Sequence, residues 1–251
     1  MCTITLAWQL FEDSPVILAA NRDEMLDRPS EPPAVRDWET SVVAPKDHQA
    51  EGTWIGYNEH GVLAAITNRW TEDPIEGDRS RGLLVRDMLG YESAEDATRF
   101  VERDLDRRTY EGFNLLVVDA NSAILIEWDG SRRVSNLDPG VHVIVNVGAN
   151  GSYSIPQKRE KHGLAQAENA NAVREAVQPE PGETGTHWLE RAADVIADHE
   201  YGVCIHRNSF GTRSSSLIQM SEDGVSYQYA DGPPCETAFD PVEAHVPVST
   251  E

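Results

Sequence analysis

A cysteine and four consecutive polar residues near the start of the chain have the side chains that covalent catalysis requires. Cys2 follows Met1, and the tetrad Asn21-Arg22-Asp23-Glu24 ends an apolar run that begins at Val16. Removal of Met1 would give Cys2 a free α-amine, and ordinary pKa values of about 8.5 for the thiol and about 7.7–8.0 for the amine permit proton transfer near neutral pH. A thiol activated by its own amine needs no histidine. The alternative is a small, buried, structural cysteine.

Two short strands are expected to place these residues side by side. The alternating run Cys2–Trp8 and the apolar run Val16–Ala20 are separated by Glu12-Asp13-Ser14-Pro15, which is typical of a turn. A hairpin returns the polar end of the second strand to the start of the first. Asp23 is then a candidate to hold the α-ammonium group by a charge-assisted hydrogen bond. The alternative is an aspartate that caps a turn.

Further motifs follow these two in a fixed order and resemble a known family. They are Arg28-Pro29, Gly52-Thr53-Trp54-Ile55-Gly56, Ala65-Ile66-Thr67-Asn68-Arg69, Ser80-Arg81-Gly82, Gly112-Phe113-Asn114-Leu115-Leu116 and Gly211-Thr212-Arg213-Ser214-Ser215. Together they resemble the NRDE family, whose eukaryotic members are called Transport and Golgi organisation protein 2, over roughly residues 1–230. That family is similar to cysteine N-terminal-nucleophile hydrolases such as penicillin V acylase and bile salt hydrolase, which cleave amides.

The resemblance implies roles for three residues later in the chain. Asn68 and Asn146 each end an apolar run and match positions that supply oxyanion-hole donors in the similar hydrolases. The alternative for both is an asparagine in a turn at a strand end. Arg213 matches a late arginine that could steady the thiolate or bind a substrate carboxylate. Its alternative is a surface arginine paired with an acid.

Arg22 departs from the bile salt hydrolase pattern. In that pattern the arginine precedes the aspartate by three residues, a position that Ala20 occupies here. Arg22 is a candidate substitute, because a nearby positive charge lowers a thiol pKa. Side chains alternate along a strand, however, so a regular strand would direct Arg22 away from Asp23.

Strands and helices arrive in blocks along the rest of the chain, which favours an α+β fold over a doubly wound parallel sheet. Strands are expected at Thr53–Tyr57, Val62–Thr67, Phe113–Asp119, Ala123–Trp128, Val141–Asn146, Ser214–Met220 and Val225–Tyr229. Helices are expected at Ser80–Leu89, from Ser93 to about Leu105, at Gln157–Ala176 and at Thr186–His199. Residues 24–50 are rich in proline and charge and are expected to form a long loop. The resemblance implies the four-layer αββα sandwich of the N-terminal-nucleophile hydrolases, as one domain over 1–232 with a polar tail at 233–251.

Composition argues against several classes of function. The chain has 43 acidic and 21 basic residues and a net charge of −22, which disfavours nucleic acid and anionic membrane surfaces as partners. Such a charge suits a salt-loaded cytoplasm, where screening limits self-repulsion, and it predicts a halophilic source. There is no signal-peptide pattern, no apolar run near the ~20 residues of a membrane span, and no disulfide framework. A cytoplasmic location is expected.

No cofactor or metal is expected from the motifs. Phosphate-cradling glycine loops are absent, and the pair Cys204 and His206 lacks further ligands nearby in the sequence, which favours a structural role for both.

Two functions of different classes remain open. The first is an amidase or acyltransferase in which Cys2 attacks a linear amide C–N carbonyl of a small molecule while Asn68 and Asn146 hold the oxyanion. The second is a non-catalytic carrier for haem or for a lipid or acyl-coenzyme A, ligands with which the resembled family has been linked. A cysteine sulfur can ligate haem iron. The intact nucleophile position favours the enzyme and the displaced arginine favours the carrier, whereas the sequence sets neither the substrate nor the oligomeric state.

Overall fold

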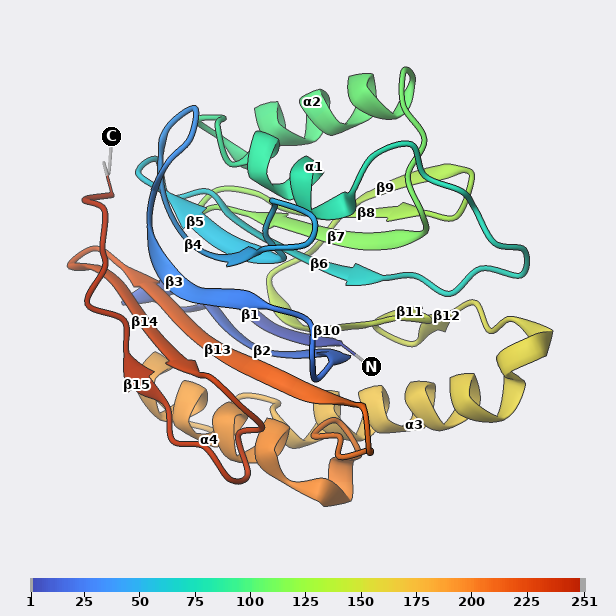
Figure 1. Ribbon diagram of the computed structural model, residues 1–251. Coiled ribbons are helices and arrows are strands. Elements are labelled where there is room, and N and C mark those ends of the chain that lie inside the picture. Colours follow the sequence, from blue (N-terminus) through green and yellow to red (C-terminus); the bar gives the residue numbers. More distant parts are fainter. Residues whose placement is uncertain (1, 249–251) are drawn as a thin grey trace. The chain divides into compact units, whose positions relative to one another are not determined.

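A computed structural model describes residues 2–248 of the chain (Figure 1). The chain divides into two compact units, one formed by Met1–Arg28 with Pro139–Val242 and the other by Pro29–Asp138 with Glu243–Glu251. Among residues 2–248, no helix is both long enough and apolar enough to cross a lipid bilayer.

The first unit is built on an eight-stranded antiparallel sheet with the order β12-β11-β10-β1-β2-β13-β14-β15. Its strands are β1 (Thr3–Phe11), β2 (Ser14–Met25), β10 (Gly140–Val145), β11 (Gly148–Ala149), β12 (Ser152–Tyr153), β13 (Phe210–Ser221), β14 (Gly224–Ala230) and β15 (Asp240–Pro241). Its helices are η1 (Gln157–Arg159), α3 (Glu160–Ala176), α4 (Gly185–Ala197) and η2 (His199–Tyr201). Helices α3 and α4 cover one face of this sheet, α3 against β10 and α4 against β2 (Figure 1).

The hairpin expected at the start of the chain is confirmed as β1 and β2, and its second strand is longer than the apolar run. Polar residues extend β2 to Met25 because they pair with β13, where Asn21 lies opposite Ser215 and Asp23 opposite Thr212. Asn21, Asp23, Thr212 and Ser215 are all buried. The tetrad is therefore part of the sheet itself, because Asn21 pairs with both β1 and β13, and Arg22, Asp23 and Glu24 pair with β13.

The second unit is built on a seven-stranded antiparallel sheet with the order β3-β4-β5-β6-β7-β8-β9. Its strands are β3 (Ser30–Asp37), β4 (Ser41–Asp47), β5 (Ile55–Asn58), β6 (Leu63–Asn68), β7 (Phe113–Val118), β8 (Ala123–Trp128) and β9 (Arg132–Asn136). Helices α1 (Arg81–Met88) and α2 (Ala94–Leu105) pack on one face, where Leu84, Met88 and Val101 join a fully buried apolar core (Figure 1). Both expected N-caps are confirmed, because the Ser80 and Ser93 hydroxyls accept backbone N–H groups of the first helical turns.

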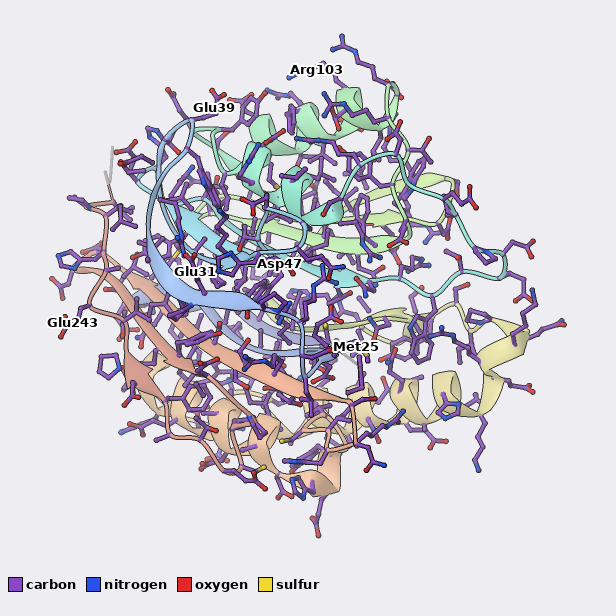
Figure 2. All side chains as sticks on the ribbon, viewed as in Figure 1. Met25, Glu31, Glu39, Asp47, Arg103 and Glu243 are labelled. Carbon is purple, nitrogen blue, oxygen red and sulfur yellow. The ribbon has the colours of Figure 1, made fainter. Side chains whose placement is uncertain are left out.

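The long loop expected over residues 24–50 is wrong, because most of this segment forms the hairpin of β3 and β4. Glu31 of β3 pairs with Lys46 of β4, and Glu31 and Asp47 mark this hairpin in Figure 2. Strand β3 lies at the edge of the sheet, and its register shifts between Glu31 and Ala34, where Pro32 and Pro33 lie. An edge strand and a bulge are the two places that tolerate proline in a sheet, so the prolines did not exclude a strand here.

Candidate active site

Three of the predicted site residues meet at one end of the eight-stranded sheet. Thr3 at the start of β1 pairs with Asn21 near the end of β2. Antiparallel pairing also brings the end of β10 and the start of β13 to this end of the sheet. Cys2 directly precedes β1, Asp23 lies near the end of β2, and Asn146 directly follows β10. Topology alone therefore gathers the predicted nucleophile, carboxylate and oxyanion donor.

The thiol of Cys2 lies against the backbone of Asp23. Its Sγ is 3.4 Å from the Asp23 amide nitrogen, which donates to it, and 3.5 Å from the Asp23 carbonyl oxygen. Cys2 is half-buried, whereas Asp23 is buried. The predicted removal of Met1 concerns a residue outside the described part of the chain and stays a prediction.

Burial governs the protonation of both groups. Burial raises the pKa of the Cys2 thiol above its ordinary value, the Asp23 carboxylate raises it further, and the positive charge of Arg22 acts in the opposite direction. Burial likewise raises the pKa of the Asp23 carboxyl, against the effect of a hydrogen bond from Thr212. The Cys2 thiol is thus neutral at rest near pH 7, and a base must remove its proton before it can attack.

Thr212 fixes the Asp23 carboxylate and was not singled out by the sequence motifs. Its Oγ1 is 2.6 Å from Asp23 Oδ1 and 2.9 Å from the backbone nitrogen of Ile205. Because the Ile205 N–H can only donate, the Thr212 hydroxyl accepts from Ile205 and gives its own proton to Asp23. This hydroxyl thereby orients the carboxylate from the β13 side. Thr212 lies within the Gly211–Ser215 motif, which is the one sequence signal that could have found it.

Gln166 on α3 fixes the orientation of the Asn146 amide. Gln166 Oε1 accepts the backbone N–H of Val147 at 2.9 Å, and Gln166 Nε2 donates to Asn146 Oδ1 at 3.1 Å. A backbone N–H must face an acceptor, so Gln166 presents its oxygen to Val147 and its NH₂ to Asn146. Gln166 and Asn146 are each 3% exposed. Asn146 must therefore direct its own NH₂ elsewhere, as an oxyanion donor requires.

Asn21, the first residue of the tetrad, joins neighbouring segments through buried side-chain hydrogen bonds. Its Nδ2 donates to the carbonyl oxygens of Ile196 at 2.8 Å and Val203 at 3.0 Å, and its Oδ1 accepts from the Ser215 hydroxyl at 2.7 Å. These bonds join β2 to the end of α4, to the segment after η2 and to β13. Buried amides with several partners rigidify their surroundings, which explains an asparagine beside the catalytic candidates.

The two predicted arginines take different positions. Arg22 lies opposite Ser214, one residue away from the Asp23 pair, so the pleat directs Arg22 and Asp23 to opposite faces of the sheet. Arg213 lies at a register shift of β13 and forms an ion pair with the exposed Asp231 at 3.2 Å. Arg213 is half-buried and paired with an acid, and its contact with substrate or thiolate stays a prediction.

Asn68 belongs to the second unit and is the last residue of β6, where it pairs with Phe113 and has an exposed side chain. Its neighbour Arg69 is buried and donates to Asn114 at 2.8 Å and to the Glu127 carboxylate at 2.7 Å. This anchor fixes the end of β6 within its own sheet. The role of Asn68 as a second oxyanion donor stays a prediction.

The family model that describes Transport and Golgi organisation 2 matches residues 1–231. The chain belongs to this family. The human Transport and Golgi organization protein 2 homolog is 26% identical over 239 residues, which cover 83% of each chain. The Bos taurus homolog of the same name is 27% identical over 233 residues, again 83% of each chain. The resemblance read from the motifs is confirmed.

Solved structures confirm the fold of this family member. Penicillin V acylase from Agrobacterium tumefaciens aligns with a TM-score of 0.53 at 14% identity, over 98% of this chain and 99% of the acylase. A Caenorhabditis elegans ortholog of N-acylethanolamine-hydrolyzing acid amidase aligns with a TM-score of 0.50 at 12% identity, over 86% of this chain and 92% of that one. The predicted α+β fold of the N-terminal-nucleophile hydrolase type is therefore confirmed. Fold likeness at such identities does not carry activity across.

Proposed function

We propose that this chain is an N-terminal cysteine hydrolase or acyltransferase that acts on a linear amide C–N bond, with Met1 removed and Cys2 as its nucleophile. The observation that supports this most is the contact between the Cys2 thiol and Asp23 at the sheet end that also holds Asn146. The fold is shared with proteins that are named as amide hydrolases.

In the proposed reaction the α-amine of Cys2 takes the thiol proton and the thiolate sulfur attacks the amide carbonyl. The Asn146 NH₂, with Asn68 as the second candidate donor, stabilises the tetrahedral oxyanion. The C–N bond breaks, the α-ammonium gives its proton to the leaving amine, and an S-acyl group remains on Cys2. Water, or a second amine, then attacks the thioester, transfers a proton to the α-amine and restores the thiol as the acyl product leaves.

Asp23 has an electrostatic role in this scheme. An α-ammonium next to the buried Asp23 carboxylate forms a charge-assisted hydrogen bond that is strong because little water screens it. Thr212 donates to one carboxylate oxygen, so Asp23 can aim the other at the ammonium. The positive charge of Arg22, which acts on the thiol pKa, favours the thiolate. Through this charge Arg22 is the candidate substitute for the arginine that the bile salt hydrolase pattern has elsewhere, with a smaller influence on the thiol pKa than burial or Asp23.

The carrier remains the second candidate, and one observation favours it. Burial and the Asp23 charge raise the pKa of the Cys2 thiol, and a neutral thiol in this state does not attack carbonyls. A haem or lipid carrier would keep such a thiol without turnover. The two functions therefore differ in whether a free α-amine on Cys2 makes its thiol react.

We also propose a cellular environment and a substrate class for the protein. A net charge of −22 supports a salt-rich cytoplasm, and it disfavours nucleic acid as a partner. The substrate class that we propose is a small-molecule amide or acyl compound, in line with the names of the structural neighbours.

The test compares the same chain with and without its α-amine. One preparation carries an N-terminal extension, and protease cleavage of that extension leaves Cys2 as the first residue of the other. We expect turnover of a chromogenic amide panel only after cleavage, weak turnover for Cys2→Ser and none for Cys2→Ala. Turnover that is independent of cleavage, or absence of turnover together with stoichiometric binding of haem or acyl-coenzyme A, would contradict the enzyme.

A further inference from the structure

Four metal-ligating side chains gather in the first unit, in a group distinct from the candidate catalytic residues. They are His199, Cys204, His206 and Cys235, and one ligand atom from each lies within 4.8 Å of the other three. Two nitrogens and two sulfurs are the donor set of many structural zinc sites. The sequence pattern showed only Cys204 and His206, because the fold supplies the other two ligands.

Local backbone structure brings the first three ligands together. His199 begins η2, whose N-terminus is capped by the Asp198 carboxylate, which accepts the Glu200 N–H at 2.8 Å. Gly202 ends η2 with φ of 62°, a left-handed conformation that suits glycine and reverses the chain. The segment then extends along the start of β13, so that Cys204 and His206, two residues apart, fall on one side of it.

The fourth ligand arrives from the segment after β14. The Pro233 carbonyl oxygen accepts the N–H groups of Glu236 and Thr237 at 3.0 and 2.9 Å, which forms a turn around Cys235. Cys235 Sγ then lies 3.4 Å from Cys204 Sγ and 3.1 Å from His206 Nε2. Cys235 lies within residues 233–251, which were expected to form a polar tail.

The distances among the ligand atoms of Cys204, His206 and Cys235 are close to, or somewhat shorter than, those of a tetrahedron around one ion. Bonds of about 2.3 Å to sulfur and about 2.0–2.1 Å to nitrogen give ligand separations of about 3.8 Å between sulfurs and about 3.6 Å between sulfur and nitrogen. The corresponding separations here are 3.4 Å for the two sulfurs, and 3.6 and 3.1 Å from His206 Nε2 to Cys204 and Cys235. The ring centroids of His199 and His206 are 5.2 Å apart and the ring planes are inclined by 66°.

We propose that His199, Cys204, His206 and Cys235 bind one divalent ion of the zinc class. Tetrahedral coordination by two sulfurs and two nitrogens selects zinc among the common divalent ions. Four protein ligands leave no position for substrate or water, so the ion is structural. A disulfide between Cys204 and Cys235 is the competing arrangement, but it needs sulfurs about 2.0 Å apart and gives the two histidines no part.

The ion would stabilise the part of the fold that orients Asp23. Ile205 lies between two ligands, and its N–H and C=O both bond to Thr212, at 2.9 and 2.8 Å. Thr212 in turn donates to Asp23. The same ion would tie η2 and the segment after β14 to the start of β13, which closes a loop between Cys204 and Cys235. Metal binding of this kind contributes directly to folding stability.

The experiment uses zinc and cobalt as probes of the full chain. Protein purified under reductant from zinc-supplemented cells is assayed for bound metal by mass spectrometry, then stripped with a chelator and titrated with Co²⁺. We expect about one zinc per chain, an intense visible spectrum of tetrahedral Co²⁺ with a thiolate charge-transfer band, and a higher melting temperature with metal than without. These measurements on the unmodified chain require no variant to fold.

Variants then assign the ligands. Cys235→Ser and His199→Ala remove ligands that are exposed in the structure, and His187→Ala removes an exposed histidine outside the cluster. We expect the two ligand variants to lose stoichiometric metal and His187→Ala to keep it. Sub-stoichiometric metal in the unmodified chain, a Co²⁺ spectrum without thiolate charge transfer, unchanged binding in the ligand variants, or a Cys204–Cys235 disulfide that forms under reductant would each overturn the proposal.

Discussion

Replacement of Gln166 by glutamate tests how the oxyanion donor is oriented. Gln166 accepts from Val147 N–H at 2.9 Å and donates to Asn146 Oδ1 at 3.1 Å. Gln166→Glu keeps the acceptor for Val147 but replaces the donor with a second carboxylate oxygen. That oxygen repels Asn146 Oδ1. If the Asn146 side-chain amide flips, its NH₂ instead donates a hydrogen bond to the new carboxylate on α3. The NH₂ is then no longer available to stabilise the oxyanion.

The expected kinetic cost is that of one oxyanion-hole donor. Removal of such a donor lowers kcat by about 10²–10³, or about 2.7–4 kcal/mol of transition-state stabilisation. Gln166→Leu removes both buried hydrogen bonds, each at a cost of about 1–3 kcal/mol in the free energy of unfolding. We therefore expect both variants to lose stability, Gln166→Leu through the lost hydrogen bonds and Gln166→Glu through a buried carboxylate. The folded fraction of Gln166→Glu should in addition lose the activity that one oxyanion donor supplies.

The assay is the rate of Cys2 acylation by an activated ester, followed by stopped-flow release of the chromophore, together with urea unfolding of each variant. Gln178→Glu is the matched control, since Gln178 is an exposed glutamine just after α3. A folded Gln166→Glu variant that acylates as fast as Gln178→Glu would show that the Asn146 amide does not act through this orientation.

Three other perturbations have defined outcomes. Thr212→Val removes the acceptor of the Ile205 N–H and the hydrogen bond that Thr212 donates to Asp23, so we expect a loss of about 1–3 kcal/mol per group in urea unfolding. Equal stability of Thr212→Val and the exposed control Thr109→Val would contradict this reasoning. Because burial raises the Asp23 pKa, the folded state binds that proton more tightly than the unfolded state does, and stability falls as pH rises from about 4 through the raised pKa. Asp23→Asn should remove this part of the pH dependence. A stability curve for the variant that runs parallel to that of the unmodified chain across this pH range would contradict a raised pKa of the Asp23 carboxyl. Lowering potassium chloride from about 1 M to about 0.01 M lengthens the screening distance from about 3 to about 30 Å. Repulsion within the net charge of −22 should then lower the melting temperature. A constant melting temperature would mean that neighbouring basic groups already compensate the acidic side chains.

The sequence predicted the hairpin at the start of the chain because its signal is local. Alternation over Cys2–Trp8 and the turn at 12–15 define both strands, and the register then brings Asp23 back to Cys2 without further information. The caps Ser80 and Ser93 were predictable for the same reason, since a cap and its helix are adjacent in the chain.

Features that depend on pairing between distant segments were not predictable. Prolines in residues 30–37 indicated a loop, and only the place of β3 at the sheet edge makes them compatible with a strand. Gln166 is one polar residue in an alanine-rich helix, and nothing in its neighbourhood shows that it faces Asn146. The Cys235 ligand is separated from Cys204 by the whole β13–β14 hairpin, so spacing rules for metal sites could not find it.

The mass of the N-terminal peptide after reaction with an acyl donor shows directly whether Cys2 is the nucleophile. Protein that begins at Cys2 is mixed with a thioester or activated amide, quenched in acid within the first turnover and digested for mass spectrometry. We expect a single acyl adduct on Cys2 that hydroxylamine removes, with none on Cys204 or Cys235 and none in Cys2→Ala. An unmodified Cys2 across a broad donor panel, or acylation confined to the other cysteines, would contradict it.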